Sequence, residues 1–171
     1  MKKVILCGYM ASGKTTIAQL LSQAMQVPYV DTDHVIEKEA GKTVAQIFET
    51  EGEIKFRKLE HNALKALIAI DDDFIIALGG GTPCYANNHK LLQTDEVVSV
   101  YLKTGIQELV NRINAQNAKR PLVANLPEEE IEEFVAKHLF ERSWYYHQAK
   151  HIVTTDGKTP EMVVTEIISL F

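Results

Sequence analysis

The chain has 171 residues, of which 46% are hydrophobic, a size and composition that suit one domain with its own apolar core over 1–171. Its 18 basic and 23 acidic residues give a formal net charge of −5, which argues against a protein that binds nucleic acid through a basic face. Two cysteines are too few for a disulfide framework and no apolar segment approaches the roughly 20 residues of a membrane span, so we expect a cytoplasmic protein with neither membrane nor nucleic acid as partner.

Short apolar runs alternate with amphipathic stretches along the whole chain. The runs that predict strands lie at 4–7, 28–30, 74–78, 97–102 and 151–153, and the stretches that predict helices include 17–25, 64–68, 106–113 and 162–167. Because strands and helices alternate, we expect an α/β fold with a mostly parallel sheet and helices on both of its faces.

Capping signals divide the segment between the second and third strands. Thr43 with Gln46 and Thr50 with Glu53 have the spacing of a capping box, which predicts three consecutive helices over 34–69. Three helices exceed what a crossover connection needs, so this segment is a candidate substrate-holding insertion.

Two later segments also carry local signals. Thr159-Pro160 reads as the cap and first position of the last helix. The polar stretch 114–125 contains Arg120-Pro121 and is long for a connection inside a compact domain, which is typical of a functional loop.

The run Gly8–Thr15 has the form G-x-x-x-x-G-K-T, directly after an apolar strand and at the start of a helical pattern. Its glycines let backbone N–H groups turn toward phosphate oxygens, and the helix N-terminus adds partial positive charge there. Lys14 would reach the β- and γ-phosphates of a nucleotide, and Thr15 would offer a hydroxyl to Mg²⁺. The alternative is a glycine-bearing turn with a solvated lysine.

An acidic pair follows the second predicted strand, in Asp31-Thr32-Asp33. Alternation along an extended strand end would point both carboxylates the same way at the carboxyl edge of the sheet, where open α/β sheets bind ligands. One carboxylate would hold waters around Mg²⁺ while the other accepts a hydrogen bond from an attacking hydroxyl. The alternative is that Asp33 caps a helix that begins at His34.

Taken in order, these motifs resemble those of the shikimate kinase family. The resemblance covers nearly the whole chain and rests on Gly8–Thr15, Asp31-Thr32-Asp33, Phe56-Arg57 with Glu60, Gly79-Gly80-Gly81, Arg120-Pro121-Leu122, and Arg142 followed by Tyr145 and Tyr146. It implies a three-layer P-loop kinase fold with a five-stranded parallel sheet, a substrate-binding region at about 33–61 and a lid at about 112–125. It also implies transfer of the ATP γ-phosphoryl group to the 3-hydroxyl of shikimate, in the biosynthesis of aromatic amino acids.

The resemblance also implies roles for individual residues. Lys14, Asp33 and Arg120 would be catalytic, and Thr15 and Asp31 would hold one Mg²⁺ per subunit, Asp31 through water. The nucleotide would contact Ala11, Ser12, Gly13, Lys14, Thr15, Thr16, Arg112, Arg120 and Lys158, and shikimate would contact Asp33, Arg57, Gly79, Gly80, Gly81 and Arg142. Phe48 and Phe56 would line the carbocycle. ATP and shikimate are the expected partners of a monomer.

Several of these assignments have simpler alternatives. The alternative for Arg57 and Arg142 is a solvated charge on a helix, and the alternative for the three glycines is a flexible turn, but together with the other motifs the site is favoured for Arg57, and three glycines after a buried strand suit close backbone approach better. On a helix, Arg57 shares a face with Glu60, which would orient its guanidinium. The chain departs from the family at Ala11, where glycine is frequent, and at Lys158, where some members carry arginine. A lysine stacks on a base less well than a planar guanidinium does, so the second departure concerns ATP affinity and base preference rather than phosphate binding.

Two other functions stay open at this point. A different small-molecule kinase of the same fold, such as a gluconate kinase, would share the phosphate loop but not the acceptor contacts. A non-catalytic nucleotide-sensing module would bind ATP and a partner without turnover.

Overall fold

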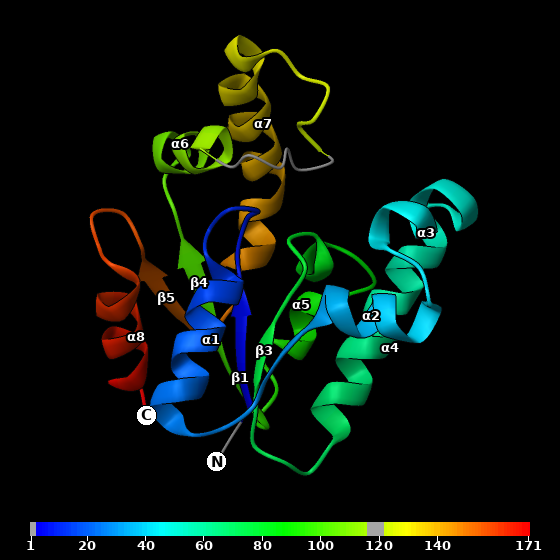
Figure 1. Cartoon of the computed structure of the whole chain (residues 1–171). Coiled ribbons are helices and arrows are strands. Elements are labelled where there is room, and N and C mark those ends of the chain that lie inside the picture. The colour runs from blue at the N-terminus through cyan, green and yellow to red at the C-terminus, as the bar shows by residue number, and fades with distance from the viewer. Residues whose placement is uncertain (1–2, 116–121) are drawn as a thin grey trace.

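The computed structural model describes residues 3–115 and 122–171, and its centre is a five-stranded sheet (Figure 1). The strands are β1 (Lys3–Cys7), β2 (Tyr29–Asp31), β3 (Ile75–Ala77), β4 (Val97–Lys103) and β5 (His151–Thr154). All neighbouring strands are parallel, in the order β2-β3-β1-β4-β5. The predicted α/β class and the five-stranded parallel sheet are confirmed.

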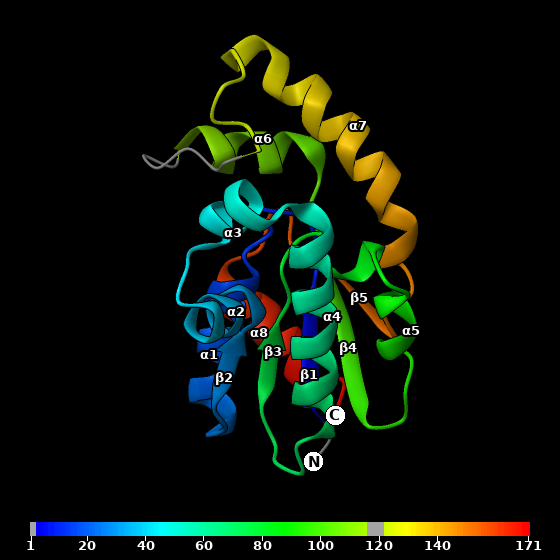
Figure 2. The same cartoon turned by 90° about the vertical axis from the view of Figure 1, so that its right-hand side faces the viewer.

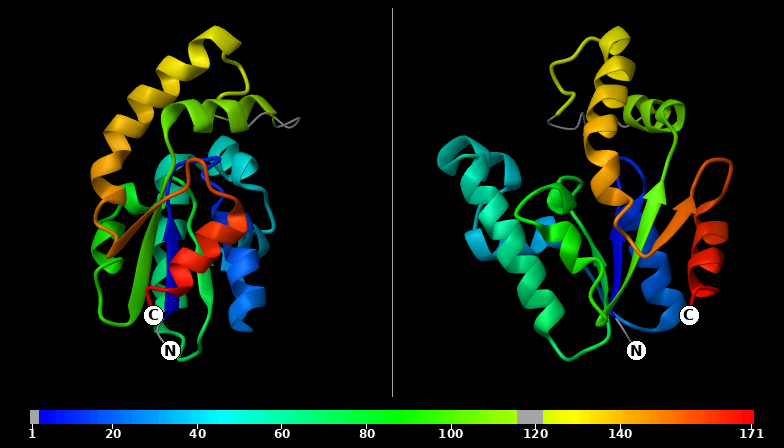
Figure 3. Two further views of the ribbon diagram at one scale, coloured as in Figure 1. Left: turned by 90° about the vertical axis from the view of Figure 1, so that its left-hand side faces the viewer. Right: turned by 180° about the vertical axis from the view of Figure 1, so that it is seen from behind.

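Helices cover both faces of this sheet. They are α1 (Lys14–Met25), α2 (Thr32–Ala40), α3 (Val44–Glu51), α4 (Glu53–Ala69), α5 (Asn88–Leu91), α6 (Ile106–Ala115), α7 (Glu128–Tyr146) and α8 (Pro160–Ile168), with a 3₁₀ turn, η1 (Thr82–Cys84). One face is covered by α1 and α8, and the other by α4, α5 and part of α7 (Figure 3). Figure 2 shows α6 and the start of α7 above the carboxyl ends of the strands. None of the helices in the described ranges is long and apolar enough to cross a bilayer.

Alternation along β1 explains why its sequence is continuously apolar. Val4 and Leu6 face the core shared with α1 and α8, whereas Ile5 and Cys7 face the larger core on the opposite side. A strand buried on both faces needs apolar side chains at every position. A third, smaller core of Ile36, Ile47, Phe56 and Ala63 holds α2, α3 and α4 together.

The capping predictions are confirmed in two of three cases. Thr43 and Gln46 form a capping box at the start of α3, and Thr159 accepts a hydrogen bond from the Met162 amide at the start of α8. The pairing of Thr50 with Glu53 is wrong, because Thr50 lies inside α3 and its hydroxyl donates to the Gln46 carbonyl. Gly52, at φ 82° and ψ 169°, separates the two helices instead. The three consecutive helices themselves are confirmed, although the first begins at Thr32 rather than His34.

Candidate active site at the carboxyl edge of the sheet

A cavity of about 640 Å³ lies at the carboxyl edge of the sheet. Its lining includes most of the residues singled out in the sequence, namely Ala11, Ser12, Gly13, Lys14, Thr15, Thr16, Asp31, Asp33, Gly79, Gly80, Arg112 and Lys158. Because β1, β2 and β3 are parallel and adjacent, the loops that follow them meet at the same edge. The phosphate loop, the acidic pair and two of the three glycines thereby line one concave site, whereas Arg57, Gly81 and Arg142 are not among its lining residues.

The phosphate loop wraps tightly between β1 and α1. At Gly8, with φ 150°, an added Cβ would come within 2.9 Å of the Leu102 carbonyl oxygen and of Ser12 Oγ. Gly13 caps α1 in the left-handed region, at φ 94°. The Lys14 ammonium donates to the carbonyl oxygens of Gly8 and Tyr9 at 2.8 and 2.9 Å, so it lies across the mouth of the loop. The loop therefore has the close-turning backbone that a phosphate cradle requires.

Ala11 adopts a left-handed backbone conformation with φ 63°. That region favours glycine, which explains physically why a glycine is frequent there in the family that the sequence resembles. The Ala11 carbonyl accepts a hydrogen bond of 3.3 Å from Arg112, whose Nε also lies 2.8 Å from Glu108 on the same helix. Arg112 thus ties α6 to the phosphate loop. Lys158 lines the cavity and pairs with Glu166 of α8 at 2.5 Å.

The acidic pair is arranged differently from the sequence prediction. Asp31 ends β2 and caps α2, and its carboxylate accepts from the Asp33 amide at 3.0 Å and from the Thr15 hydroxyl at 2.9 Å. The expected strand-like alternation of both carboxylates is wrong, and so is the alternative that Asp33 is the cap. The reason is that Asp31 satisfies the first helical amides, which starts the helix one residue after the strand. Both carboxylates still line the cavity.

Thr32, between the two acids, was not predicted to have a role. Its buried hydroxyl accepts from the Gly79 amide at 2.9 Å and lies 3.4 Å from the Ala77 carbonyl oxygen. This contact joins the start of α2 to the end of β3. The contact therefore fixes the position of the acidic pair relative to the three glycines.

Asp33 carries the most unusual carboxylate of the site. Burial raises its pKa to about 6, assisted by the negative charges of Asp31 and Glu60, while Lys14 acts in the opposite direction. Within the described part of the chain, its buried Oδ1 atom has no hydrogen-bond donor. A buried acceptor without a donor is costly unless a ligand supplies one. Asp33 is therefore suited to receive a hydroxyl group.

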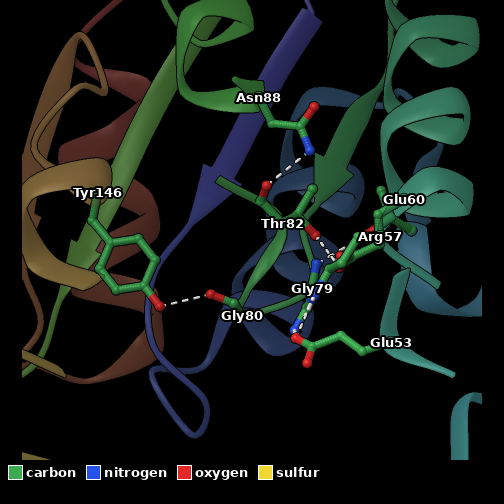
Figure 4. Close-up of polar contacts among 9 residues, drawn as sticks. Glu53, Arg57, Glu60, Gly79, Gly80, Thr82, Asn88 and Tyr146 are labelled. Carbon is green, nitrogen blue, oxygen red and sulfur yellow. Dashed lines mark hydrogen bonds and ion pairs between the residues drawn. The ribbon is translucent and has the colours of Figure 1, made fainter. Parts of the chain in front are cut away.

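The three glycines lie against polar side chains of the site, and Figure 4 shows two of them, Gly79 and Gly80, near Arg57 and Tyr146. A Cβ on Gly79 would come 2.6 Å from Asp33 Oδ1, and a Cβ on Gly81 would come 2.7 Å from Arg57 Nη1. A Cβ on Gly80 would lie 3.9 Å from Arg142 Nη1. Side chains at the first and third positions would displace groups that the sequence marks as functional, so these two glycines are needed for close approach.

Arg57 is oriented by several contacts rather than solvated. Its Nη1 lies 2.7 Å from Glu60 Oε2, and its Nη2 lies 3.2 Å from Glu53 Oε1. The ring of Tyr85 covers its guanidinium at 3.9 Å. The predicted contact between Arg57 and Glu60 is confirmed. Although burial acts to lower the pKa of Arg57, the charge of Glu60 raises it above its ordinary value.

The aromatic pair near Arg57 has a mixed environment. The Phe48 and Phe56 rings lie 4.6 Å apart and both approach the Arg57 guanidinium. Phe56 is buried in the small core of the three helices, whereas Phe48 is 37% exposed. Neither is among the residues that line the cavity.

The far side of the acceptor end is supplied by α7. Arg142 is buried, at 8% exposure, and the fully buried Tyr146 donates from its hydroxyl to the Gly80 carbonyl at 2.6 Å. This hydrogen bond fixes the middle peptide of the glycine triplet. The sequence marked Tyr146 only as part of a motif, and nothing in its pattern revealed this contact.

Two predicted features lie partly or wholly outside the described residues. Arg120 falls between the two described ranges, as does the central part of the predicted lid at 112–125. Only the end of α6 and the segment after 121 are described. Their assignment stays a prediction.

Oxygen donors suited to Mg²⁺ meet where Thr15 and Asp31 hydrogen-bond. Within the described ranges, no three His, Cys, Asp or Glu side chains gather closely enough to enclose an ion. Mg²⁺ commonly keeps several waters and is held by one or two protein oxygens together with substrate phosphates. The donor set therefore fits Mg²⁺ bound jointly with a nucleotide.

Both the sequence and the fold of the chain match known proteins. The model of the shikimate kinase family matches residues 10–171. A shikimate kinase of Flavobacterium johnsoniae is 53% identical over 170 residues, which cover 99% of each chain. The crystal structure of the Bacteroides thetaiotaomicron shikimate kinase matches with a TM-score of 0.90 at 29% identity, covering 99% of this chain and 97% of that one. The Acinetobacter baumannii enzyme, solved in complex with shikimate, matches with a TM-score of 0.87 at 29% identity, covering 99% and 92%.

Proposed function

The chain belongs to the shikimate kinase family, and from this premise we propose that its cavity transfers the γ-phosphoryl group of ATP to the 3-hydroxyl of shikimate, giving ADP and shikimate 3-phosphate. One observation carries the proposal. Asp33 lines the same cavity as the phosphate loop, and within the described residues its buried Oδ1 atom has no hydrogen-bond donor. It lies against Gly79, and Gly81 of the same triplet lies against the Arg57 guanidinium. A hydroxyl held there would face the terminal phosphate.

At the nucleotide end, the loop amides and the N-terminus of α1 would bind the phosphates. Lys14 would exchange its contacts with the Gly8 and Tyr9 carbonyls for phosphate oxygens, which offer the stronger charge-assisted hydrogen bonds. Ala11, Ser12, Gly13, Thr15 and Thr16 complete this cradle, while Arg112 and Lys158 stand at the positions assigned to the nucleoside.

Mg²⁺, when bound, would neutralise charge on the phosphates during transfer. The Thr15 hydroxyl and, through water, the Asp31 carboxylate would hold it. We assign one such ion to each subunit.

At the acceptor end, shikimate needs cations for its carboxylate and close polar contacts for its hydroxyls. Arg57 and Arg142 would bind the carboxylate with their planar guanidinium groups. Gly79, Gly80 and Gly81 would admit the ring to the backbone, within the substrate-binding region formed with residues 33–61. Asp33 would accept the hydrogen bond of the 3-hydroxyl and take its proton as the oxygen attacks phosphorus.

Phosphoryl transfer has a loose transition state, so positioning and charge matter more than base strength. Arg120, on a lid at about 112–125, would add positive charge to the transferring group and exclude water. Exclusion of water is needed because the same site would otherwise hydrolyse ATP.

We expect the enzyme to work as a monomer in the cytoplasm, which size-exclusion chromatography with light scattering and cell fractionation would test.

The experiment that tests the proposal is an assay of ADP release with a panel of hydroxy acids. Shikimate is expected to give turnover, with gluconate near the background rate. Turnover with gluconate instead would identify another kinase of this fold. ATP binding with no acceptor-dependent ADP would indicate a nucleotide-sensing module.

A further inference from the structure

Glu60 is a buried carboxylate with two different partners, one on each oxygen. It is 1% exposed, its Oε2 contacts Arg57 Nη1 at 2.7 Å, and its Oε1 accepts from the Thr82 hydroxyl at 2.6 Å (Figure 4). A buried charge is tolerated only when its oxygens are hydrogen-bonded. The Thr82 hydroxyl is therefore one of the two groups, with Arg57, that hold the Glu60 carboxylate in place.

Thr82 is itself held from both sides. It is fully buried at the start of η1, its amide donates to the Gly79 carbonyl at 3.1 Å, and its carbonyl accepts from Asn88 Nδ2 at 2.8 Å. Asn88 is also fully buried, and its Oδ1 lies 2.7 Å from His61 Nδ1 of α4. The hydroxyl of Thr82 thus has a fixed position relative to α4, which carries Arg57.

The other contacts of Arg57 constrain the orientation of its guanidinium less than Glu60 does. The Oε1 atom of Glu53 contacts two nitrogens of Arg57, Nε at 3.3 Å and Nη2 at 3.2 Å, but Glu53 is 54% exposed, so these longer contacts are open to competition from water. Tyr85 stacks on the guanidinium face without fixing its rotation in the plane. Among the described residues, only Glu60 combines burial with a contact of 2.7 Å to a guanidinium nitrogen. Because Oε1 accepts the hydrogen bond from Thr82, Glu60 contacts Arg57 through Oε2 alone. The guanidinium therefore does not form a bidentate ion pair with this carboxylate.

We propose that Thr82 is a positioning residue, whose hydroxyl holds Glu60 so that Arg57 keeps its donors directed at the carboxylate of the acceptor. This inference rests on the proposed role of Arg57 in binding shikimate. Without the hydroxyl, the uncovered Oε1 atom competes for the guanidinium, and Arg57 turns toward Glu60 and away from the acceptor. The defect then belongs to acceptor binding, not to ATP binding or the chemical step.

Thr82→Val removes the hydroxyl and keeps the shape of the side chain. We expect it to raise the shikimate KM by about tenfold, the order of one charge-assisted hydrogen bond, with kcat and the ATP KM within about twofold of the wild type. Thr82→Ser, which keeps the hydroxyl, is expected to restore the shikimate KM. Thr94→Val is the matched control, since it deletes a half-buried threonine hydroxyl that donates to the Leu91 carbonyl away from the cavity.

A double-mutant cycle with Arg57→Ala separates positioning from a general effect on the fold. In the Arg57→Ala background, Thr82→Val is expected to cause no further rise in the shikimate KM. Independent, multiplying effects would overturn the proposal, as would an unchanged KM in Thr82→Val alone. If Arg57→Ala alone leaves the shikimate KM unchanged, the proposed role of Arg57 fails instead.

Thr82→Ala provides the same test if valine next to a carboxylate prevents folding, because alanine removes the hydroxyl without adding a methyl group there. Circular dichroism and the thermal midpoint are measured for each variant. If neither variant folds, the hydroxyl serves the fold and the proposal is wrong.

Discussion

Asp33 combines the features expected of a residue that meets the reacting hydroxyl. Its buried Oδ1 atom has no donor among the residues that the structure describes, and its pKa is raised to about 6 by burial and by the nearby charges of Asp31 and Glu60. At neutral pH it is still mostly ionised, so it is an acceptor whose missing partner a substrate would supply.

Asp33→Asn is expected to lower kcat by about 100-fold while changing the shikimate KM only a few-fold, because the amide still fills the site but no longer takes a proton. Steady-state kinetics with both substrates provide the measurement. Asp95→Asn, at an exposed position before β4, is the control. A fully active Asp33→Asn enzyme would remove the hydroxyl contact from the account.

Gly81 gives a second test at the residue scale. Its φ is −91°, which any residue adopts, so a substitution there acts through space and not through backbone strain. Gly81→Ala would place a Cβ 2.7 Å from Arg57 Nη1, and Glu60 and Tyr85 restrict the retreat of that guanidinium.

We expect Gly81→Ala to raise the shikimate KM by roughly tenfold, the value of one displaced charge-assisted contact, and to leave the ATP KM unchanged. The thermal midpoint is expected to stay near that of the wild type. A variant that lost stability but kept its shikimate KM would show that the glycine serves packing alone.

At the scale of elements, α7 supports the glycine triplet through the hydrogen bond between Tyr146 and Gly80. Tyr146 is fully buried, and its hydroxyl donates to the Gly80 carbonyl at 2.6 Å. Gly80 itself is half-buried, and without this donor its carbonyl loses its hydrogen bond to α7.

Tyr146→Phe is therefore expected to cost about 1–3 kcal/mol of unfolding free energy, measured by urea denaturation. The adjacent Tyr145→Phe is the matched control, since Tyr145 is only half-buried. Equal stabilities of the two variants would mean that the Tyr146 hydroxyl contributes nothing to the junction between α7 and the glycines.

Apolar periodicity and capping motifs predicted the helices and strands well but missed boundaries between consecutive elements. The strands β1, β3 and β4 were predicted because burial on both faces demands a continuous apolar run, whereas the edge strands β2 and β5 are mostly half-buried or exposed and gave weaker patterns. The capping box at Thr43 was predicted because its two hydrogen bonds are local. Thr50 misled because the same residue type also forms a hydrogen bond inside a helix, to the carbonyl four residues earlier. Gly52 itself indicated a break between two helices, but the capping-box spacing of Thr50 and Glu53 obscured that indication.

The candidate site shows the same contrast between residues that a local pattern reveals and contacts that depend on distant parts of the chain. Lys14 and Arg57 belong to motifs that the sequence displays, and their roles stay predictions. The contacts of Thr32, Thr82 and Tyr146 were not predicted, because their partners lie 22 to 66 positions away and only the fold brings them together. Thr82 directly follows the glycine triplet, which was the one available hint.

At the scale of the whole molecule, protonation of His138 links pH to stability. Its Nδ1 lies 2.9 Å from the Tyr9 hydroxyl, so the phosphate loop contacts α7 through this pair. Burial, assisted by the positive charge of Arg142, lowers the pKa of His138 to about 4. An unfolded histidine titrates near 6.5, so between these values the unfolded chain binds the extra proton.

The unfolding free energy should therefore fall as pH drops from about 6.5 to 4, and His138→Gln should remove about 1–2 kcal/mol of that fall, after allowance for solvent near a half-buried ring. Urea denaturation at pH 7 and at pH 4.5 measures the difference. His34→Gln, at an exposed position of α2, is the control. A His138→Gln profile that parallels the wild type at both pH values would contradict the assignment.

The most direct measurement of the central claim identifies the product. The purified enzyme is incubated with ATP, Mg²⁺ and shikimate, and the product is examined by ³¹P and ¹H NMR. We expect a phosphate ester coupled to the proton on carbon 3 of shikimate, formed in equal amount with ADP. An ester at another hydroxyl, or ADP accompanied only by inorganic phosphate, would contradict it.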